Sequence, residues 1–278
     1  MNTRAKTPYD LNDEETVSVI DELSLWSAPF GMKLLDTIIL KDNLSVLDIG
    51  FGLGFPIVEV ALRLGKSSRV YGIDPWQAGM ARAKKKIDIF GIDNIQLIEG
   101  VAENIPLPDA SIDLIISNNG INNVRDLQTV LKECARIARP GAQFVATVNL
   151  PETMAEFYKI FESVLTDTGL AAVVPKMHQH IYHKRRPVEE VTKLFKDNQF
   201  AVTGTLYDSF KFRYADGTAM LNHPFIRYAF MDSWIELLPQ EKADGVFSEI
   251  ERRMNAVAKK KGEWNLTIPF VVIDARRI

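Results

Sequence analysis

The stretch VLDIGFGLGF, at residues 46–55, decides the fold of this chain. A short apolar run precedes Gly50, Gly52 and Gly54, and a helical pattern opens at Pro56. Glycine lets the backbone turn sharply and lets a ligand approach it closely at the carboxyl edge of a parallel sheet. A tight strand-to-helix turn without any ligand explains the same glycines, so the loop alone leaves both interpretations open.

Around this loop, β-rich segments alternate with amphipathic helical ones, which is the pattern of βαβ units. Helix ends are indicated by Pro56, Gly65 and Gly91, by a cap at Asp126, and by a turn at RPGA, residues 139–142. The expected strands span residues 45–49, 69–73, 95–99, 112–117 and 143–148, and the expected helices span residues 56–65, 77–90 and 127–138.

After residue 149 the alternation weakens. The expected helices span residues 152–168 and 187–198, a sixth strand spans 200–207, and residues 218–261 are mostly helical. Residues 210–214 alternate as a strand, and residues 265–273 return to strand character. Because this last strand can complete the sheet that begins at Ser45, we expect a single domain with two insertions.

The composition limits the function. A net charge of −3 and a pI near 5.9 offer little attraction for nucleic acid. The single cysteine, Cys134, excludes an internal disulfide and a thiolate zinc cluster, and its helical surroundings indicate a buried structural thiol. Apolar runs are strand-length and the N-terminus has no signal-peptide core, so we expect a cytoplasmic protein without membrane insertion.

Asp74 adds chemistry to the glycine loop. It ends the segment RVYGID twenty residues after Gly54, where a carboxylate can accept hydrogen bonds from both hydroxyls of a ribose or cap the next helix. Trp76 could lie over an adenine face or simply pack. Phe55 stands where a dinucleotide fingerprint needs its third glycine, which argues against a bound pyrophosphate.

Four motifs occur in order: VLDIGFGLG, GID at residues 72–74, GVAENIPLPDASIDLIISN at 100–118, and ARPGAQFVAT at 138–147. With them the chain resembles class I S-adenosylmethionine-dependent methyltransferases. The resemblance implies an α/β, Rossmann-like fold with a seven-stranded, mostly parallel sheet, helices on both faces and a helical lid. It also implies S-adenosylmethionine as the cofactor, bound across the ends of strands one, two and four.

Within the family, the chain is similar to small-molecule methyltransferases of the ubiquinone and menaquinone type. The segment SNNGINN, at residues 117–123, is also similar to arsenite methyltransferases, whose arsenic-binding cysteines this chain lacks. We expect one methyltransferase domain over residues 1–278, with a helical lid at 1–43 and a cofactor-binding core at 44–150. The insertions at 151–187 and 208–262 would form a cap over the acceptor.

The resemblance implies roles for individual residues. Asp48 would help to hold the amino group of the methionine part, which Gly50 and Gly52 would face, and Asp74 would bind the ribose. Ala102 would offer its backbone N–H to the adenine ring. The predicted cofactor site comprises Asp48, Gly50, Phe51, Gly52, Asp74, Pro75, Trp76, Ala102, Glu103, Asn118 and Asn119.

Val101 departs from the family pattern, which often has an aspartate there to accept from the adenine amino group. Either Glu103 or a backbone carbonyl substitutes for it, or adenine is held by apolar packing against Ile105. Asn118 and Asn119 would line the path from the methyl group to the acceptor, although turn chemistry is the favoured explanation of these short amides.

The acceptor site should lie in the lid and the insertions. Three histidines, His178, His180 and His183, stand beside basic residues, which favours a solvated or anion-binding edge over a metal site, and we assign no metal. Core packing explains the aromatic residues of these segments as well as acceptor binding does. The candidate acceptor residues are Tyr9, Trp26, His180, Tyr214, His223 and Arg227.

The expected function is methyl transfer from S-adenosylmethionine to an O, N or C atom of a small-molecule acceptor by in-line displacement. Positioning supplies most of the rate in such a reaction, and we assign no catalytic residue. The alternatives are a non-catalytic cofactor-binding module or partner subunit and, below it, an NAD-dependent oxidoreductase. The expected partners are the small acceptor and a second copy of the chain in a homodimer, without nucleic acid.

Overall fold

The computed structural model describes residues 9–22 and 25–278, which divide into two compact units. The α/β unit comprises Leu11–Leu150, Arg185–Asp208 and Phe270–Ile278, apart from residues 23–24. The helical unit comprises Pro151–Lys184, Ser209–Pro269 and the described part of Met1–Asp10. Part of the predicted lid, residues 1–8 and 23–24, lies outside the described residues.

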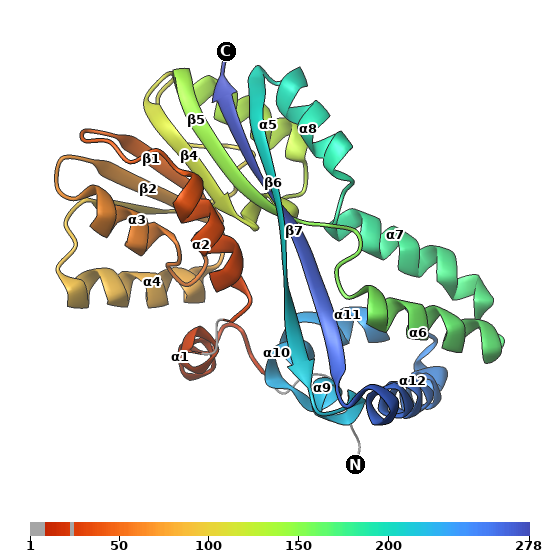
Figure 1. Cartoon of the computed structure of the whole chain (residues 1–278). Coiled ribbons are helices and arrows are strands. Elements are labelled where there is room, and N and C mark those ends of the chain that lie inside the picture. The colour runs from red at the N-terminus through yellow and green to blue at the C-terminus, as the bar shows by residue number, and fades with distance from the viewer. Residues whose placement is uncertain (1–8, 23–24) are drawn as a thin grey trace. The chain divides into compact units, whose positions relative to one another are not determined.

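One seven-stranded sheet organises the α/β unit, and two of its strands continue into the helical unit (Figure 1). The strand order is β3-β2-β1-β4-β5-β7-β6. Strands β1 to β5 pair in parallel, and β7 pairs antiparallel to β5, so the prediction of a mostly parallel, Rossmann-like sheet is confirmed. The strands are β1 Ser45–Ile49, β2 Arg69–Asp74, β3 Ile95–Glu99, β4 Ile112–Asn118, β5 Ala138–Asn149, β6 Phe200–Tyr214 and β7 Trp264–Arg277.

Helices cover both faces of this sheet. On one face α5 and α8 enclose a core in which Phe144 of β5 meets Phe195 of α8, with ring centroids 4.9 Å apart. Cys134 of α5 is fully buried in the same core, as predicted for a structural thiol. The helices of the α/β unit are α1 Glu14–Glu22, α2 Ser27–Thr37, α3 Ile57–Leu64, α4 Gln77–Phe90, η1 Gly120–Asn122, α5 Leu127–Ile137 and α8 Val188–Asp197.

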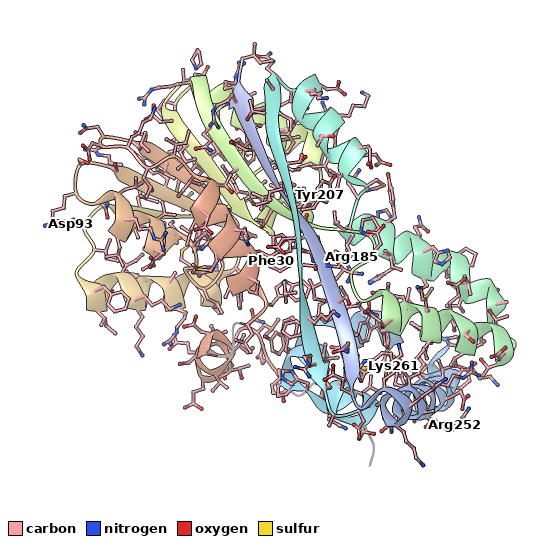
Figure 2. All side chains as sticks on the ribbon, in the orientation of Figure 1. Phe30, Asp93, Arg185, Tyr207, Arg252 and Lys261 are labelled. Atoms are coloured by element: carbon pink, nitrogen blue, oxygen red, sulfur yellow. The ribbon has the colours of Figure 1, made fainter. Side chains whose placement is uncertain are left out.

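On the opposite face α3 lies directly against β2. A Cβ added to Gly72 of β2 would come within 2.5 Å of the Ile57 side chain, so this close approach requires glycine. Phe30 of α2, labelled in Figure 2, is fully buried beside Phe270, with ring centroids 4.7 Å apart.

Local sequence signals explain where these helices begin and end. The carboxylate of Asp126 accepts the N–H of Gln128 and caps α5, as predicted. Gly91 ends α4 with φ 62°, in the left-handed conformation that favours glycine. Pro56 lies just before α3 rather than at its first position.

The helical unit is built around buried aromatic side chains. Trp234 stacks on Phe157 with ring centroids 4.0 Å apart and donates its indole N–H to the Tyr158 hydroxyl at 3.0 Å. The exposed side of α12 carries Arg252, which pairs with Glu249 (Figure 2). The elements are α6 Ala155–Asp167, η2 Ala171–Val173, α7 Val174–Lys184, α9 Gly217–Asn222, α10 Pro224–Ile226, the π-helix η3 Arg227–Met231, α11 Asp232–Ile235 and α12 Gln240–Lys261.

Two expectations about the later segments are corrected. The strand expected over residues 200–207 and the alternating segment at 210–214 are one continuous strand, β6. The expected turn RPGA lies inside β5, whose pairing with β4 is irregular between Ile112 and Leu114. The stretch with His178, His180 and His183, to which no secondary structure was assigned above, is helix α7. No helix in the described part of the chain is long and apolar enough to cross a membrane.

Candidate cofactor site

A cavity of about 370 Å³ lies at the carboxyl ends of β1, β2 and β3 and beside the loop that follows β4. Ligands of open α/β sheets bind at this edge. All of its lining residues belong to the α/β unit. They are Ile49, Gly50, Ile73, Asp74, Pro75, Gly100, Val101, Ala102, Glu103, Gly120, Asn123, Val124 and Arg125.

The glycine loop forms one wall and depends on positive φ angles. Gly50 has φ 76°, and a Cβ there would lie only 2.7 Å from the Cα of Gly120 in η1. Gly52 has φ 51°, and a Cβ there would meet nothing within 4 Å. Gly50 is therefore needed for packing, whereas Gly52 leaves its backbone open to a ligand.

Asp74 connects this loop to the end of β2. Its Oδ2 accepts the backbone N–H of Gly52 and its Oδ1 accepts that of Trp76, both at 2.8 Å. A carboxylate has about four acceptor positions, so each oxygen can still accept another hydrogen bond. Burial raises the pKa of Asp74, and the two N–H donors counteract part of that rise. Asp74 therefore holds the backbone at Trp76, the N-cap residue of α4, without capping that helix itself, and it also presents a carboxylate to the cavity.

Asp48 is the second acid beneath the loop. It is fully buried in β1, and within the described residues its carboxylate oxygens make no hydrogen bond of standard geometry, although the Ile57 N–H acts weakly on them. Burial, followed by repulsion from Asp74, raises its pKa well above the usual range, with a small opposing effect of the Ile57 N–H. Two neighbouring acids, one without a partner, suit a ligand that carries positive charge.

The loop after β4 is held by a buried hydroxyl. Thr147 Oγ1 of β5 donates to Asn118 Oδ1 and accepts the backbone N–H of Asn119, each at 3.0 Å. Asn118 Nδ2 donates to the carbonyl of Ser27 at the start of α2. Asn119 adopts φ 62°, which short amides tolerate. Both asparagines thus have the turn role considered above, and neither lines the cavity.

At the other end of the cavity, Glu103 holds the turn before α5. Its Oε1 accepts the backbone N–H groups of Arg125 and Asp126, at 2.8 and 3.2 Å. Ala102 is buried in the wall, while the apolar side chain of Val101 is 44% exposed. The carboxylate of Glu103 is therefore already used in part by the backbone.

Two predicted cofactor residues pack elsewhere in the α/β unit. The Trp76 ring lies against Gly79, where an added Cβ would come within 2.5 Å, and its indole N–H donates to the carbonyl of Leu11 at 2.8 Å. Phe51 is buried against Gly72. For Trp76, packing is the role that the described contacts support.

Of the predicted cofactor residues, Gly50, Asp74, Pro75, Ala102 and Glu103 line the cavity. Asp48 and Gly52 are not lining residues: Gly52 is hydrogen-bonded to the lining residue Asp74 and has open space beside its Cα, whereas Asp48 is buried in β1. The sequence interpretation missed further lining residues, although the position of SNNGINN after the fourth strand was a signal for Gly120 and Asn123. They are Ile49, Ile73, Gly100, Gly120, Asn123, Val124 and Arg125.

The candidate acceptor residues fall in both units. Trp26 lies in the α/β unit against Phe30, with ring centroids 5.4 Å apart. His180 is part of α7 and Arg227 begins η3, both in the helical unit. Tyr9 meets Tyr228 in the helical unit, at 6.1 Å between centroids.

The helical unit brings Tyr214 and His223 together, with ring centroids 5.5 Å apart. The hydroxyl of Tyr214 and the Nδ1 atom of His223 are buried without a hydrogen-bond partner among the described residues. Burial raises the pKa of Tyr214 to about 12 and lowers that of His223. Both side chains are therefore neutral near pH 7 and have unused hydrogen-bonding capacity.

Comparison with known proteins identifies the core. Residues 47–146 match the family described as "Methyltransferase domain". A demethylmenaquinone methyltransferase of a Geobacillus species is 32% identical over 115 residues, which are 41% of this chain and 49% of that protein. The corresponding protein of Bacillus velezensis is 27% identical over 186 residues, 64% of this chain and 79% of that one. The chain spans about half the length of most of the curated relatives it matches.

Solved structures share the fold. A SAM-dependent methyltransferase from Aquifex aeolicus gives a TM-score of 0.53 at 22% identity, over 68% of this chain and 91% of that chain. Geranyl diphosphate C-methyltransferase from Streptomyces coelicolor gives 0.55 at 17% identity, over 99% of this chain and 91% of that chain. The ordered motifs, the strand order and these matches agree, and residues 47–146 form a methyltransferase domain with the class I, Rossmann-like fold.

Proposed function

We propose that this chain transfers a methyl group from S-adenosylmethionine to a small-molecule acceptor. The observation that carries the proposal is the cavity at the carboxyl edge of the sheet, in which Asp74 is held by Gly52 and still has acceptor positions to offer. A volume of about 370 Å³ suits a nucleoside-sized ligand.

The electrostatics of the site fit this cofactor. S-adenosylmethionine has a sulfonium and an ammonium group against one carboxylate, so it carries net positive charge. The pKa values of Asp48 and Asp74 are raised in the ligand-free chain, and a nearby cation would favour their ionised forms. A pyrophosphate would instead meet two acids, which disfavours the NAD-dependent alternative.

The protein's part in the reaction is to bind and orient. When bound, S-adenosylmethionine supplies a methyl group on a positively charged sulfur that leaves as a neutral thioether. An electron pair of the acceptor forms the new bond, and a proton carried by the acceptor is released to water or a base. Asp74 would hold the ribose, and the Gly52 backbone would let the methionine part approach. Fixed geometry of this kind supplies most of the rate.

For the acceptor we propose an aromatic ring of the kind that demethylmenaquinone provides. The support is the name that the curated relatives carry, and those relatives match mainly the core of this chain. We further assign residues 151–187 and 208–262 to the acceptor cap. A cytoplasmic location, a homodimer and the lack of a nucleic-acid substrate stay predictions from the sequence.

The test has two steps. Calorimetry with S-adenosylmethionine and S-adenosylhomocysteine should give micromolar binding, and no binding at millimolar ligand would refute the proposal. The unaltered chain should then transfer tritium from methyl-labelled cofactor to a reduced demethylmenaquinone analogue faster than the Asp74→Ala control does. Binding without transfer to any of a panel of phenols, amines and quinols would favour the non-catalytic module, whereas NAD binding would favour the oxidoreductase.

A further inference from the structure

At position 101, just beyond β3, the resemblance to methyltransferases implies a carboxylate for the adenine amino group, and this chain has none there. The position is occupied by Val101, whose apolar side chain is 44% exposed on the cavity wall. Valine cannot accept a hydrogen bond from the amino group of adenine. It can, however, cover one face of a flat base and become buried when the base binds.

Arg125 stands on the loop between β4 and α5. Its backbone N–H donates to Oε1 of Glu103 at 2.8 Å. This hydrogen bond links the loop to the segment that contains Val101, because Glu103 lies two residues after Val101 in the chain. The Arg125 residue lines the cavity and is exposed. Its guanidinium makes no hydrogen bond or ion pair within residues 9–22 and 25–278. The group is thus available to a ligand.

The chemistry of a guanidinium suits a purine face. It is planar, delocalised and weakly hydrated, so it stacks on aromatic rings at a low desolvation cost. Stacking is tolerant of the substituents at the ring edge, because every base has a π-face. A guanidinium near the ring edge can also donate to a purine nitrogen or to a carbonyl oxygen, whereas an aspartate repels a carbonyl.

We propose that Arg125 and Val101 hold the purine of the cofactor by its faces, and that this site consequently does not require the 6-amino group. The inference rests on the proposed function, since it concerns the same cofactor. It extends that function to specificity: the cavity accepts a hypoxanthine base, with oxygen at position 6, almost as well as adenine.

Calorimetry with S-adenosyl-L-homocysteine and S-inosyl-L-homocysteine tests this directly. For the unaltered chain we expect the two dissociation constants to agree within about threefold, less than 1 kcal/mol. Val101→Asp should restore selectivity and weaken the inosyl ligand by roughly tenfold or more relative to the adenosyl one. Arg125→Ala should weaken both ligands by about tenfold, and Arg125→Lys, which lacks the plane, should not recover the loss. The matched control is Arg63→Ala on α3, outside the cavity, which should change neither constant.

The outcomes separate the two proposals. If neither homocysteine ligand binds, the cofactor assignment itself fails. If S-adenosyl-L-homocysteine binds and the inosyl ligand is weaker by about thirtyfold or more, the cofactor assignment stands and the present inference is wrong. In that case Glu103→Gln should abolish the selectivity if the free oxygen of Glu103 reads the amino group. If Arg125→Ala binds both ligands as tightly as the unaltered chain does, the proposed role of Arg125 is also wrong.

Discussion

The carboxylate of Asp74 accepts the backbone N–H of Gly52 at 2.8 Å, so the end of β2 holds the loop that follows β1. The two residues are twenty-two positions apart in the chain. Through this bond a residue that would contact the ribose also fixes the backbone that would face the rest of the cofactor. Binding and loop geometry are therefore coupled at one side chain.

Replacing Asp74 should weaken both cofactor binding and stability. Asp74→Ala removes the acceptor for two backbone N–H groups and for the ribose, and we expect roughly a hundredfold loss of S-adenosylhomocysteine affinity. The unpaired N–H groups should lower the unfolding free energy by about 1–3 kcal/mol. Calorimetry and thermal unfolding measure the two effects. Asp74→Asn keeps one acceptor oxygen, so its affinity should lie between those of Asp74→Ala and the unaltered chain. If both variants bind S-adenosylhomocysteine as tightly as the unaltered chain, Asp74 does not bind the ribose.

Gly50 and Gly52 should respond differently to alanine. At Gly50 the new Cβ meets the backbone of Gly120 and φ is positive, so we expect a loss of roughly 3 kcal/mol of stability. At Gly52 the new Cβ meets open space and only the positive φ costs, about 1 kcal/mol. Gly52→Ala should nevertheless weaken S-adenosylhomocysteine by roughly tenfold, because the ligand needs the backbone there. Denaturant unfolding and calorimetry distinguish the pair, and equal stability losses would refute this account.

Asp48 should make stability depend on pH. Because its pKa is raised in the folded chain, the native state keeps a proton that the unfolded chain has lost above about pH 4. The stabilisation is complete below the unfolded pKa and is lost as pH rises toward the folded one. Asparagine does not titrate, so Asp48→Asn loses this pH dependence. The melting temperature of the variant minus that of the unaltered chain should therefore increase from pH 5 to pH 8. A difference that is constant with pH would show that Asp48 is ionised in the native state.

Two tyrosines of the helical unit, the buried Tyr158 and the half-buried Tyr214, form a contrasting pair. The Tyr214 hydroxyl has no hydrogen-bond partner among the described residues, so Tyr214→Phe should raise the unfolding free energy by about 1 kcal/mol. The Tyr158 hydroxyl accepts the indole N–H of Trp234, so Tyr158→Phe should lower it by about the same amount. Thermal unfolding compares them. If Tyr214→Phe is more stable but loses methyl transfer, the hydroxyl is retained for the acceptor; a lower stability would mean that it has a partner when folded.

The core elements could be predicted because their signals are local. The bounds expected for the strands at 45–49 and 95–99 and for the helix at 77–90 agree with the structure, since each depends on a side-chain period and a nearby stop such as Gly91. β6 was underestimated, because a long strand at the sheet edge keeps no regular buried face, and most of its first residues are exposed.

The base-binding end of the site could not be predicted to the same extent. Val101 was recognised from its motif position, whereas Arg125 was missed because no spacing rule connects it to residue 101. Both line the cavity, and their segments are linked by the hydrogen bond from the Arg125 backbone to Glu103, twenty-two residues away. The packing of Trp76 on Gly79 and its bond to Leu11 likewise depend on how the chain folds back on itself.

By itself, the sequence determined the class of fold, the glycine loop and the identity of Asp74 as the acid beside it. These follow from periodicity, from the conformational freedom of glycine and from motif order along the chain. Only the tertiary structure decided which side chains face the cavity and which are used up in holding its walls. A hydrogen bond or a buried orphan atom is a property of two or more segments brought together, and periodicity describes only one segment at a time.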